Sequence, residues 1–339
     1  MDSVTHVAFG AAIGEILMGH KLGKKAMLIG AIACTVPDLD VFLTMGNHDP
    51  LAYVQMHRSY SHAPFTHFFL ALPLAYITYL LYKKKQDFLP LYGLWLVAML
   101  LHSTVDLCTT FGTQFLLPFT NQLVAFNSIN IIDPLYTLPM LVWFFTSWVR
   151  KRSNFNSRKF AIVAMVVSHL YMLSVLAVKG VAHRQFTNQL QQQHIPYTEL
   201  STTPAILNGM LWSGIAYNDS MISVGEYSIW DKDKNTRFVT FNRNRNLEQQ
   251  YAGDKLNTVK WFSQGKYLME AVTDTTARFY IVKWGRFDFS KNTAEQTFKF
   301  YYTLTKSQGK VTITVHDPGD DDFKFSEAFA QLWQRIFYN

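Results

Sequence analysis

The chain of 339 residues contains only two cysteines and lacks the short motifs of the common soluble enzyme classes. Cys34 and Cys108 both lie in apolar segments, which excludes a disulfide framework and a cysteine-based zinc motif; we expect both to be small buried residues. The sequence has no nucleophile elbow, P-loop, dinucleotide fingerprint or His-Glu-x-x-His helix. It also lacks a basic segment before the first apolar stretch, so we expect that stretch to be retained as a helix.

Charge is also scarce, because charged residues make up only 16% of the chain, although the formal net charge is +7. A basic protein invites a nucleic-acid interpretation. In the first half, however, the basic residues cluster in short loops between apolar runs, which is typical of the cytoplasmic loops of membrane proteins. We therefore expect no nucleic-acid partner, and membrane lipids as the surroundings of the chain.

The apolar residues are unevenly distributed and divide the chain near Gly180. We predict a membrane-spanning domain over residues 1–180 and a soluble, β-rich domain over residues 181–339. A spanning helix needs about 20 mostly apolar residues. Candidate stretches, the first of them short, lie at 4–19, 25–45, 64–82, 88–107, 131–149 and 160–178.

The loops between these stretches predict an orientation. Eleven Lys and Arg residues follow the first, third and fifth stretches, whereas the loops 46–63 and 109–130 contain only Arg58. Basic loops stay in the cytoplasm, so the N-terminus and everything after the sixth stretch are expected outside. The predicted fold is a membrane α-helical bundle of about six spans followed by an extracytoplasmic β-rich α+β domain.

The second half shows the alternation of apolar residues that is typical of strands. Alternating apolar residues occur at Phe298, Phe300, Tyr302 and Leu304, and again at Val311, Ile313 and Val315. Earlier strand-like runs lie near 209–230, 236–242, 258–272 and 277–289, after a Gln-rich helical or linker segment over 181–200. A final helix is expected from Ser326, with one apolar face formed by Phe329, Leu332, Trp333 and Ile336.

Acidic residues and histidines gather at the predicted outer face. Of the eight acidic residues before residue 180, six fall there. Charges at membrane depth are costly and usually mark function, and clustered carboxylates repel one another without a cation. His102 and Asp106 are four residues apart and share a helical face. Asp38 and Asp40 follow Pro37, where the helix breaks and both carboxylates can turn toward a common point.

These residues predict a metal site, because His and Asp together suit a divalent ion. Zinc is the first choice, with manganese or magnesium as alternatives and one or two ions per chain. The predicted ligands are His6, Asp38, Asp40, His57, His62, His102 and Asp106. Asp40 is also a candidate general base, with Asp38 and Asp106 as alternatives, and Arg58 is predicted to hold an anionic substrate group. His67 is a weaker candidate, and Asp133 also suits a helix cap.

Several short motifs keep a fixed order along the first part of the chain. They are Thr5-His6, Pro37-Asp38-Leu39-Asp40, His57-Arg58, Ser61-His62, His102-Ser103-Thr104-Val105-Asp106, Gly112 and Leu117-Pro118-Phe119. Over roughly residues 1–145 the chain resembles the bacterial inner-membrane metal-dependent hydrolase family of the LexA-regulated YdjM type. The resemblance implies a metal-dependent hydrolase in the bacterial inner membrane. Ser61-His62-Ala63 departs from the family's Thr-His-Ser run: the histidine is kept and one hydroxyl is lost.

The predicted function is hydrolysis of an ester, with a phosphoester of a lipid or lipid-linked molecule as the first substrate, by water activated on the metal. The soluble domain is then expected to cover the site or select the substrate. A non-enzymatic metal sensor or scaffold is the alternative, and the choice depends on whether the metal keeps a position open for water. Metal transport is disfavoured, because only Glu15 continues the polar residues into the inner half of the helices.

Overall fold

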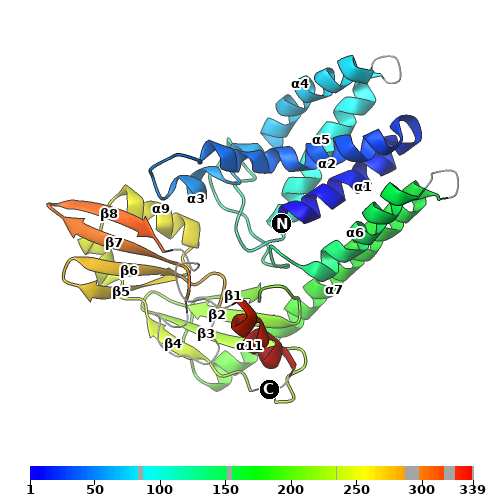
Figure 1. Ribbon diagram of the computed structural model, residues 1–339. Coiled ribbons are helices and arrows are strands. Elements are labelled where there is room, and N and C mark those ends of the chain that lie inside the picture. The colour runs from blue at the N-terminus through cyan, green and yellow to red at the C-terminus, as the bar shows by residue number, and fades with distance from the viewer. Residues whose placement is uncertain (83–86, 151–154, 234, 287–297, 317–324, 338–339) are drawn as a thin grey trace. The chain divides into compact units, whose positions relative to one another are not determined.

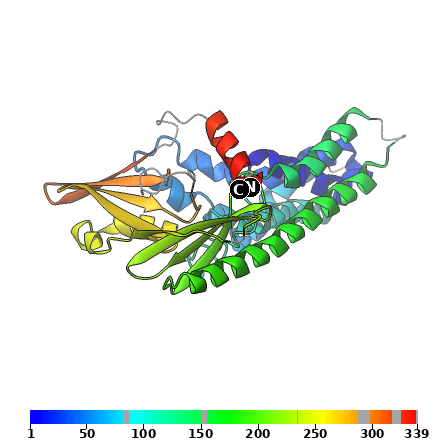
Figure 2. The same cartoon turned by 90° about the horizontal axis from the view of Figure 1, so that it is seen from below.

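The computed structural model describes residues 1–82, 87–150, 155–233, 235–286, 298–316 and 325–337. The chain forms two compact units, one of Met1–Asn47 with Ala52–Ser174 and one of His48–Leu51 with Val175–Asn339. Helix α7 (Ser157–Gln192) belongs to both, and Figure 2 shows it as one uninterrupted helix. The composition boundary predicted near Gly180 therefore falls within a helix, and the Gln-rich segment continues that helix as far as Gln192.

The first unit is helical (Figure 1). Besides the start of α7, its elements are α1 (Ser3–Leu22), α2 (Lys24–Thr35), η1 (Val36–Leu43), α3 (Ala52–Met56), η2 (Tyr60–His62), α4 (Pro64–Tyr82), α5 (Phe88–Leu107) and α6 (Pro134–Val149). The predicted stretches 64–82 and 88–107 coincide with α4 and α5. The stretch 25–45 is α-helical only to Thr35 and then tightens into the 3₁₀ helix η1, because Pro37 has no N–H to continue the α-helical ladder.

Side-chain caps fix where two of these helices begin. The Asp2 carboxylate accepts a hydrogen bond of 3.0 Å from the backbone N–H of Thr5 at the start of α1. The Asp133 carboxylate accepts the N–H groups of Leu135 and Tyr136 at 3.0 and 3.3 Å, and Pro134 occupies the first helical position. The cap interpretation of Asp133 is therefore confirmed.

Helix α1 packs against α2, α5 and α6. Its contact with α2 is made by glycines, because a Cβ atom on Gly10, Gly14 or Gly30 would collide with backbone atoms of the facing helix. Gly10 and Gly14 are four residues apart on α1, a spacing that allows two helices to approach closely. This close approach holds α1 against the segment that leads to Pro37 and Asp38.

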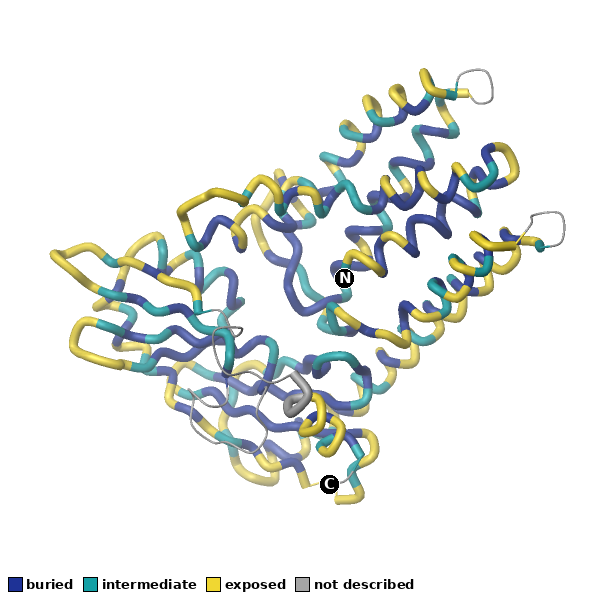
Figure 3. Tube along the Cα trace, viewed as in Figure 1, coloured by how far each residue is buried: buried dark blue, intermediate teal, exposed yellow. Residues whose placement is uncertain are grey.

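The outer faces of the helical unit are apolar and exposed, as the yellow segments of Figure 3 show. Phe69 on α4 is 59% exposed, Leu81 74% and Val149 on α6 77%. A soluble surface rarely exposes so much apolar area, whereas a bilayer solvates it. Four helical segments have the length and hydropathy to cross a membrane: Lys24–Leu43, Pro64–Tyr82, Phe88–Leu107 and Ser157–Gln192.

The predicted count of about six spans is thus supported for four segments of the described chain. Helix α6 has only 16 residues, fewer than the roughly 20 needed to span the hydrocarbon core. Helix α1 has 20 residues but is not among the segments that meet both measures. Several of the loop cations behind the predicted orientation lie outside the described residues: Lys83, Lys84, Lys85, Lys151 and Arg152.

The second unit contains two four-stranded antiparallel sheets. The first sheet has the order β1 (Glu199–Pro204), β2 (Leu211–Tyr217), β3 (Met221–Ser228) and β4 (Val239–Asn242). The second has the order β5 (Tyr267–Thr273), β6 (Thr276–Ile281), β7 (Tyr301–Ser307) and β8 (Lys310–Val315). Its helices are α8 (Asn246–Gln250), α9 (Asp254–Ser263) and α11 (Phe325–Phe337). One apolar core joins both sheets, with Ile215 and Val224 from the first packed with Leu268 and Tyr280 from the second.

The predicted strand over 258–272 was wrong in its first half, which belongs to α9. Leu256, Val259 and Phe262 are buried at a helical spacing, a signal that the alternation analysis overlooked. The end of the run 277–289 lies outside the described residues. Helix α11 includes Phe329, Leu332, Trp333 and Ile336 at the spacing of one face, as expected. Leu332 and Ile336 are buried on that face, whereas Phe329 and Trp333 are 43% and 51% exposed.

Candidate metal centre

Four predicted ligands converge within the helical unit. Asp38 comes from η1, His62 from η2, and His102 and Asp106 from the last turns of α5. One ligand atom from each lies within 4.8 Å of the other three. His62, His102 and Asp106 have fully buried side chains, whereas that of Asp38 is 15% exposed. We refer to these four residues as the four-ligand group.

The spacing of these atoms matches a tetrahedral ion. His62 Nε2 lies 3.1 Å from His102 Nε2, 3.4 Å from Asp38 Oδ1 and 3.3 Å from Asp106 Oδ2. His102 Nε2 lies 3.5 Å from Asp38 Oδ1 and 3.7 Å from Asp106 Oδ2. Metal–ligand bonds of 2.0–2.1 Å give tetrahedral edges of roughly 3.3–3.4 Å. Five of the six distances between the two imidazole nitrogens and the two carboxylate oxygens therefore lie close to those of a zinc-type ion.

Asp106 is the most heavily partnered carboxylate of the site. Its Oδ1 atom contacts the α-amino group of Met1 and lies 3.2 Å from His6 Nε2. Its Oδ2 atom lies 3.0 Å from Arg58 Nε. Among the described residues, Asp106 Oδ2 and Arg58 Nε have no hydrogen-bond partner of good geometry, not even each other. A fully buried carboxylate oxygen without an aligned donor, facing two imidazole nitrogens, is suited to receive a cation.

Arg58 is only 2% exposed, and its guanidinium lies beside the Asp106 carboxylate. Its backbone has a positive φ of 59°, which is uncommon for a residue with a side chain. This conformation lets its N–H donate to Asp40 Oδ2 at 3.0 Å while Nη1 donates to Thr109 Oγ1 at 2.7 Å. The guanidinium also lies 5.1 Å from the centre of the Phe111 ring. These contacts make Arg58 a positioning residue for Asp106; its contact with a substrate anion stays a prediction.

Asp40 and His57 lie outside the four-ligand group. Asp40 Oδ1 contacts His57 Nδ1 at 2.8 Å, and Asp40 Oδ2 accepts the Ser61 hydroxyl and lies 3.5 Å from His62 Nδ1. Ligating histidines usually pass their second ring nitrogen to a carboxylate, which fixes the ring. Asp40 therefore suits the role of orienting His62. The roles of Asp40 as ligand and base, and of His57 as ligand, stay predictions.

The tight winding of η1 explains why Asp38 and Asp40 separate. With three residues per turn, residues two apart point in directions about 120° apart. Asp38 consequently approaches Nε2 of His62 and Asp40 approaches Nδ1 of the same ring. Both carboxylates turn toward His62, as the break at Pro37 suggested, but they meet opposite edges of its ring.

The electrostatics of His62 favour a positive charge at the centre. Burial acts to lower the pKa of His62, but interactions with the carboxylates of Asp106, Asp38 and Asp40 outweigh burial and raise the pKa to about 10. Three carboxylates therefore hold a proton on this ring near neutral pH. A divalent cation bound to the four-ligand group would displace that proton.

His6 stands beside the four-ligand group rather than in it. Its ring lies against that of His102, with centroids 3.7 Å apart and planes tilted by 30°. His6 also forms a separate cluster with Cys34 and His102. His67, the weaker candidate, lies 2.8 Å from the Ser61 carbonyl oxygen through its Nε2 atom and steadies the loop before α4.

Sequence reasoning missed three supporting residues. Ser61 links Asp40 to His62, and Thr109 links the Arg58 guanidinium to the Asp106 carbonyl. Ser61 was noted only as part of a motif, and Thr109 carries no signal that distinguishes it from other threonines. Cys34 was interpreted as a small buried residue, which its burial confirms, but its position next to two histidines was not foreseen.

Comparison with known proteins shows a family for the helical part of the chain. The sequence profile of the YdjM inner membrane protein family matches residues 1–186, which is more than half of the chain and includes every predicted ligand. The protein YfhP of Bacillus subtilis (strain 168), which is uncharacterized, is 34% identical over 141 residues, or 40% of this chain and 42% of YfhP. The match thus spans less than half of that relative. No solved structure matches the chain. The chain belongs to the YdjM inner membrane protein family.

Proposed function

We propose that this protein is a membrane-bound metal-dependent hydrolase that cleaves an ester or phosphoester of a lipid or lipid-linked molecule. The observation that carries the proposal is the four-ligand group, in which five interatomic distances of 3.1–3.7 Å match the edges of a tetrahedral zinc site. A bound divalent ion would supply Lewis acidity at the ester oxygen and toward water.

The exposure of Asp38 supports catalysis. It is the one member of the four-ligand group whose side chain reaches solvent, so water can approach on that side. Both oxygens of Asp40 and of Asp106 already face cationic or donor groups. Asp38 is therefore the best placed of the three carboxylates to accept a proton from the attacking water.

The alternative function is a structural metal clamp or sensor. It is favoured by the presence of four protein ligands, three of them fully buried, because structural zinc sites are closed tetrahedra whereas catalytic sites keep one open position. In the hydrolase, Asp38 would yield its position to water or substrate. In the clamp, Asp38 would stay bound.

Metal content and hydrolysis distinguish these functions. Purified protein should contain zinc or manganese, and His62→Ala should lose about one equivalent because the ligand is removed. His20→Ala, which removes an exposed imidazole in the last turn of α1, should keep the wild-type metal content. Elemental mass spectrometry and a screen of phosphatidic acid, phospholipids and soluble phosphoesters provide the readout.

Metal-dependent turnover that His62→Ala abolishes supports the hydrolase. Bound metal without turnover of any ester in either metal form supports the clamp. Protein that contains no metal and takes none up from zinc or manganese solutions contradicts both.

We also propose that the centre opens at the extracytoplasmic face of the inner membrane and that the second unit lies on that side. The support is the distribution of Lys and Arg among the predicted loops and the family's inner-membrane location. Reporter tags after Lys85 and after Asn339 should then report opposite sides, the first cytoplasmic. The same side for both tags would contradict the proposed orientation.

A further inference from the structure

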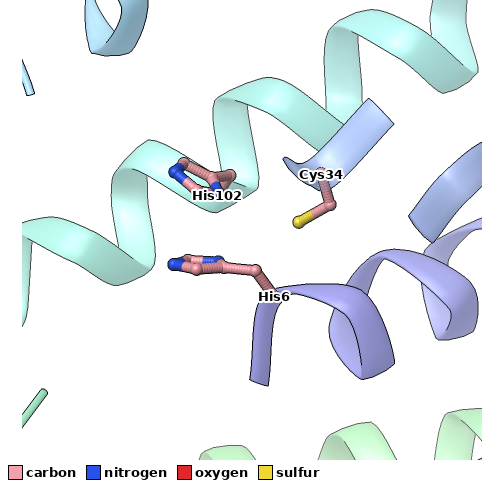
Figure 4. Close-up of side chains that lie close together, drawn as sticks. All are labelled: His6, Cys34 and His102. Carbon is pink, nitrogen blue, oxygen red and sulfur yellow. The ribbon is translucent and has the colours of Figure 1, made fainter. Parts of the chain in front are cut away.

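We propose that Cys34, His6 and His102 bind a second metal ion, of the thiophilic zinc type, at the edge of the His102 ring opposite the four-ligand group. One ligand atom of each lies within 4.8 Å of the other two. Figure 4 shows the two imidazole rings one above the other, with the Cys34 sulfur directed toward them. All three residues are fully buried.

Each of the two imidazole rings has one nitrogen with a partner and one without. Nε2 of His102 belongs to the four-ligand group, and Nε2 of His6 lies 3.2 Å from Asp106 Oδ1. Nδ1 of each ring is buried and has no hydrogen-bond partner among the described residues. Buried polar atoms are normally satisfied, and a ligating histidine normally has a partner for its second nitrogen. Two such orphaned nitrogens beside one thiol indicate a missing ligand.

The chemistry of the three donors selects a metal. A thiolate and two imidazoles suit Zn²⁺ and softer ions and suit Mg²⁺ or Ca²⁺ poorly. His6 can keep its proton on Nε2, where Asp106 accepts it, and offer the Nδ1 lone pair. Binding displaces the thiol proton of Cys34. When the four-ligand group is also occupied, the Nδ1 proton of His102 leaves as well, so that the imidazolate bridges two ions.

The position of this ion gives it a structural role. His6 lies on α1, Cys34 on α2 and His102 on α5, so one ion would tie three helices together. The two nitrogens of an imidazole point to opposite edges of the ring, so the ions would be farther apart than the roughly 3.5–4 Å of a two-metal catalytic clamp. The second ion would not share the attacking water; it would fix the His102 ring. The proposal rests on the proposed function only in sharing His102.

Titration of the full-length, metal-stripped protein in detergent with Co²⁺ tests the second site. A thiolate ligand gives an intense sulfur-to-cobalt charge-transfer band in the near ultraviolet, which the nitrogen and oxygen donors of the four-ligand group do not produce. We expect this band and about two bound equivalents in the wild type, but no band and about one equivalent in Cys34→Ser. Cys108→Ser, which removes the other cysteine, should match the wild type.

Two results would overturn the second site: no charge-transfer band in the wild type at saturating Co²⁺, or a band and stoichiometry unchanged in Cys34→Ser. The folding of Cys34→Ser is checked by its retained first equivalent and its d–d absorption. Asp38→Ala separates the two proposals, because it removes a ligand of the four-ligand group alone. If Asp38→Ala loses one equivalent of Co²⁺ and keeps the band, both sites are supported. If it keeps two equivalents and the band, only the four-ligand group is contradicted.

Discussion

Asp106→Ala is expected to abolish binding at the four-ligand group and to lower the free energy of unfolding by about 3–5 kcal/mol. The Asp106 side chain is fully buried against Arg58, His6 and the α-amino group of Met1. Its removal leaves the Arg58 guanidinium, itself 2% exposed, without its carboxylate. A buried charge that loses its partner costs far more than the pair contributes when intact. Metal content and thermal unfolding in detergent measure the two effects.

Two further variants accompany Asp106→Ala. Asp87→Ala removes the carboxylate at the opposite end of α5, where Asp87 makes no side-chain cap, and should leave both quantities unchanged. Asp106→Asn keeps the shape but not the charge, and should lose the metal. If Asp106→Ala retained a wild-type metal content, the assignment of Asp106 as a ligand would fail.

Gly30→Ala is expected to destabilise the helical unit by about 1–3 kcal/mol or more and to weaken metal binding. The added Cβ would collide with the Gly10 carbonyl oxygen and the backbone of Gly14 on α1, atoms that cannot move aside as a side chain can. Because α2 continues into the segment that carries Asp38, separating α1 from α2 also displaces a ligand. Thermal unfolding and metal affinity report the outcome.

Gly93→Ala provides the matched control. Gly93 is also a helical glycine, in α5, but a Cβ there meets nothing within 4 Å. Alanine in place of a helical glycine with open space at its Cβ position should stabilise the helix by up to about 1 kcal/mol. Equal effects of the two substitutions would show that the close contact of α1 and α2 does not hold the site.

The sequence predicted which residues gather at the candidate metal centre better than it predicted their arrangement. His102 and Asp106 share a face of an uninterrupted helix, so their spacing alone placed them together. The roles of Asp38 and Asp40 depend on the 3₁₀ winding of η1, and that of Arg58 on a positive φ. Neither backbone feature follows from hydropathy or from residue type.

The elements of the fold also differ in how well the sequence predicted them. Apolar runs with clear ends gave α4 and α5 their bounds, since both are long and begin at a proline or after an aspartate. The C-terminal part was harder, because short runs such as 258–272 contain both helical and alternating periods. Phe329 and Leu332 lie close in sequence on one helix, yet only Leu332 is buried, and this depends on packing across the whole unit.

The short distances within the four-ligand group imply a selective cage. Five of the six distances between the donors already lie near the values that a small ion requires, so little conformational entropy would be lost on binding. Calcium prefers roughly six to eight oxygens at 2.3–2.6 Å, and magnesium an octahedron rich in water. Both would have to expand the cage against the packing of η1, η2 and α5. We therefore expect a site that discriminates by size against these two ions.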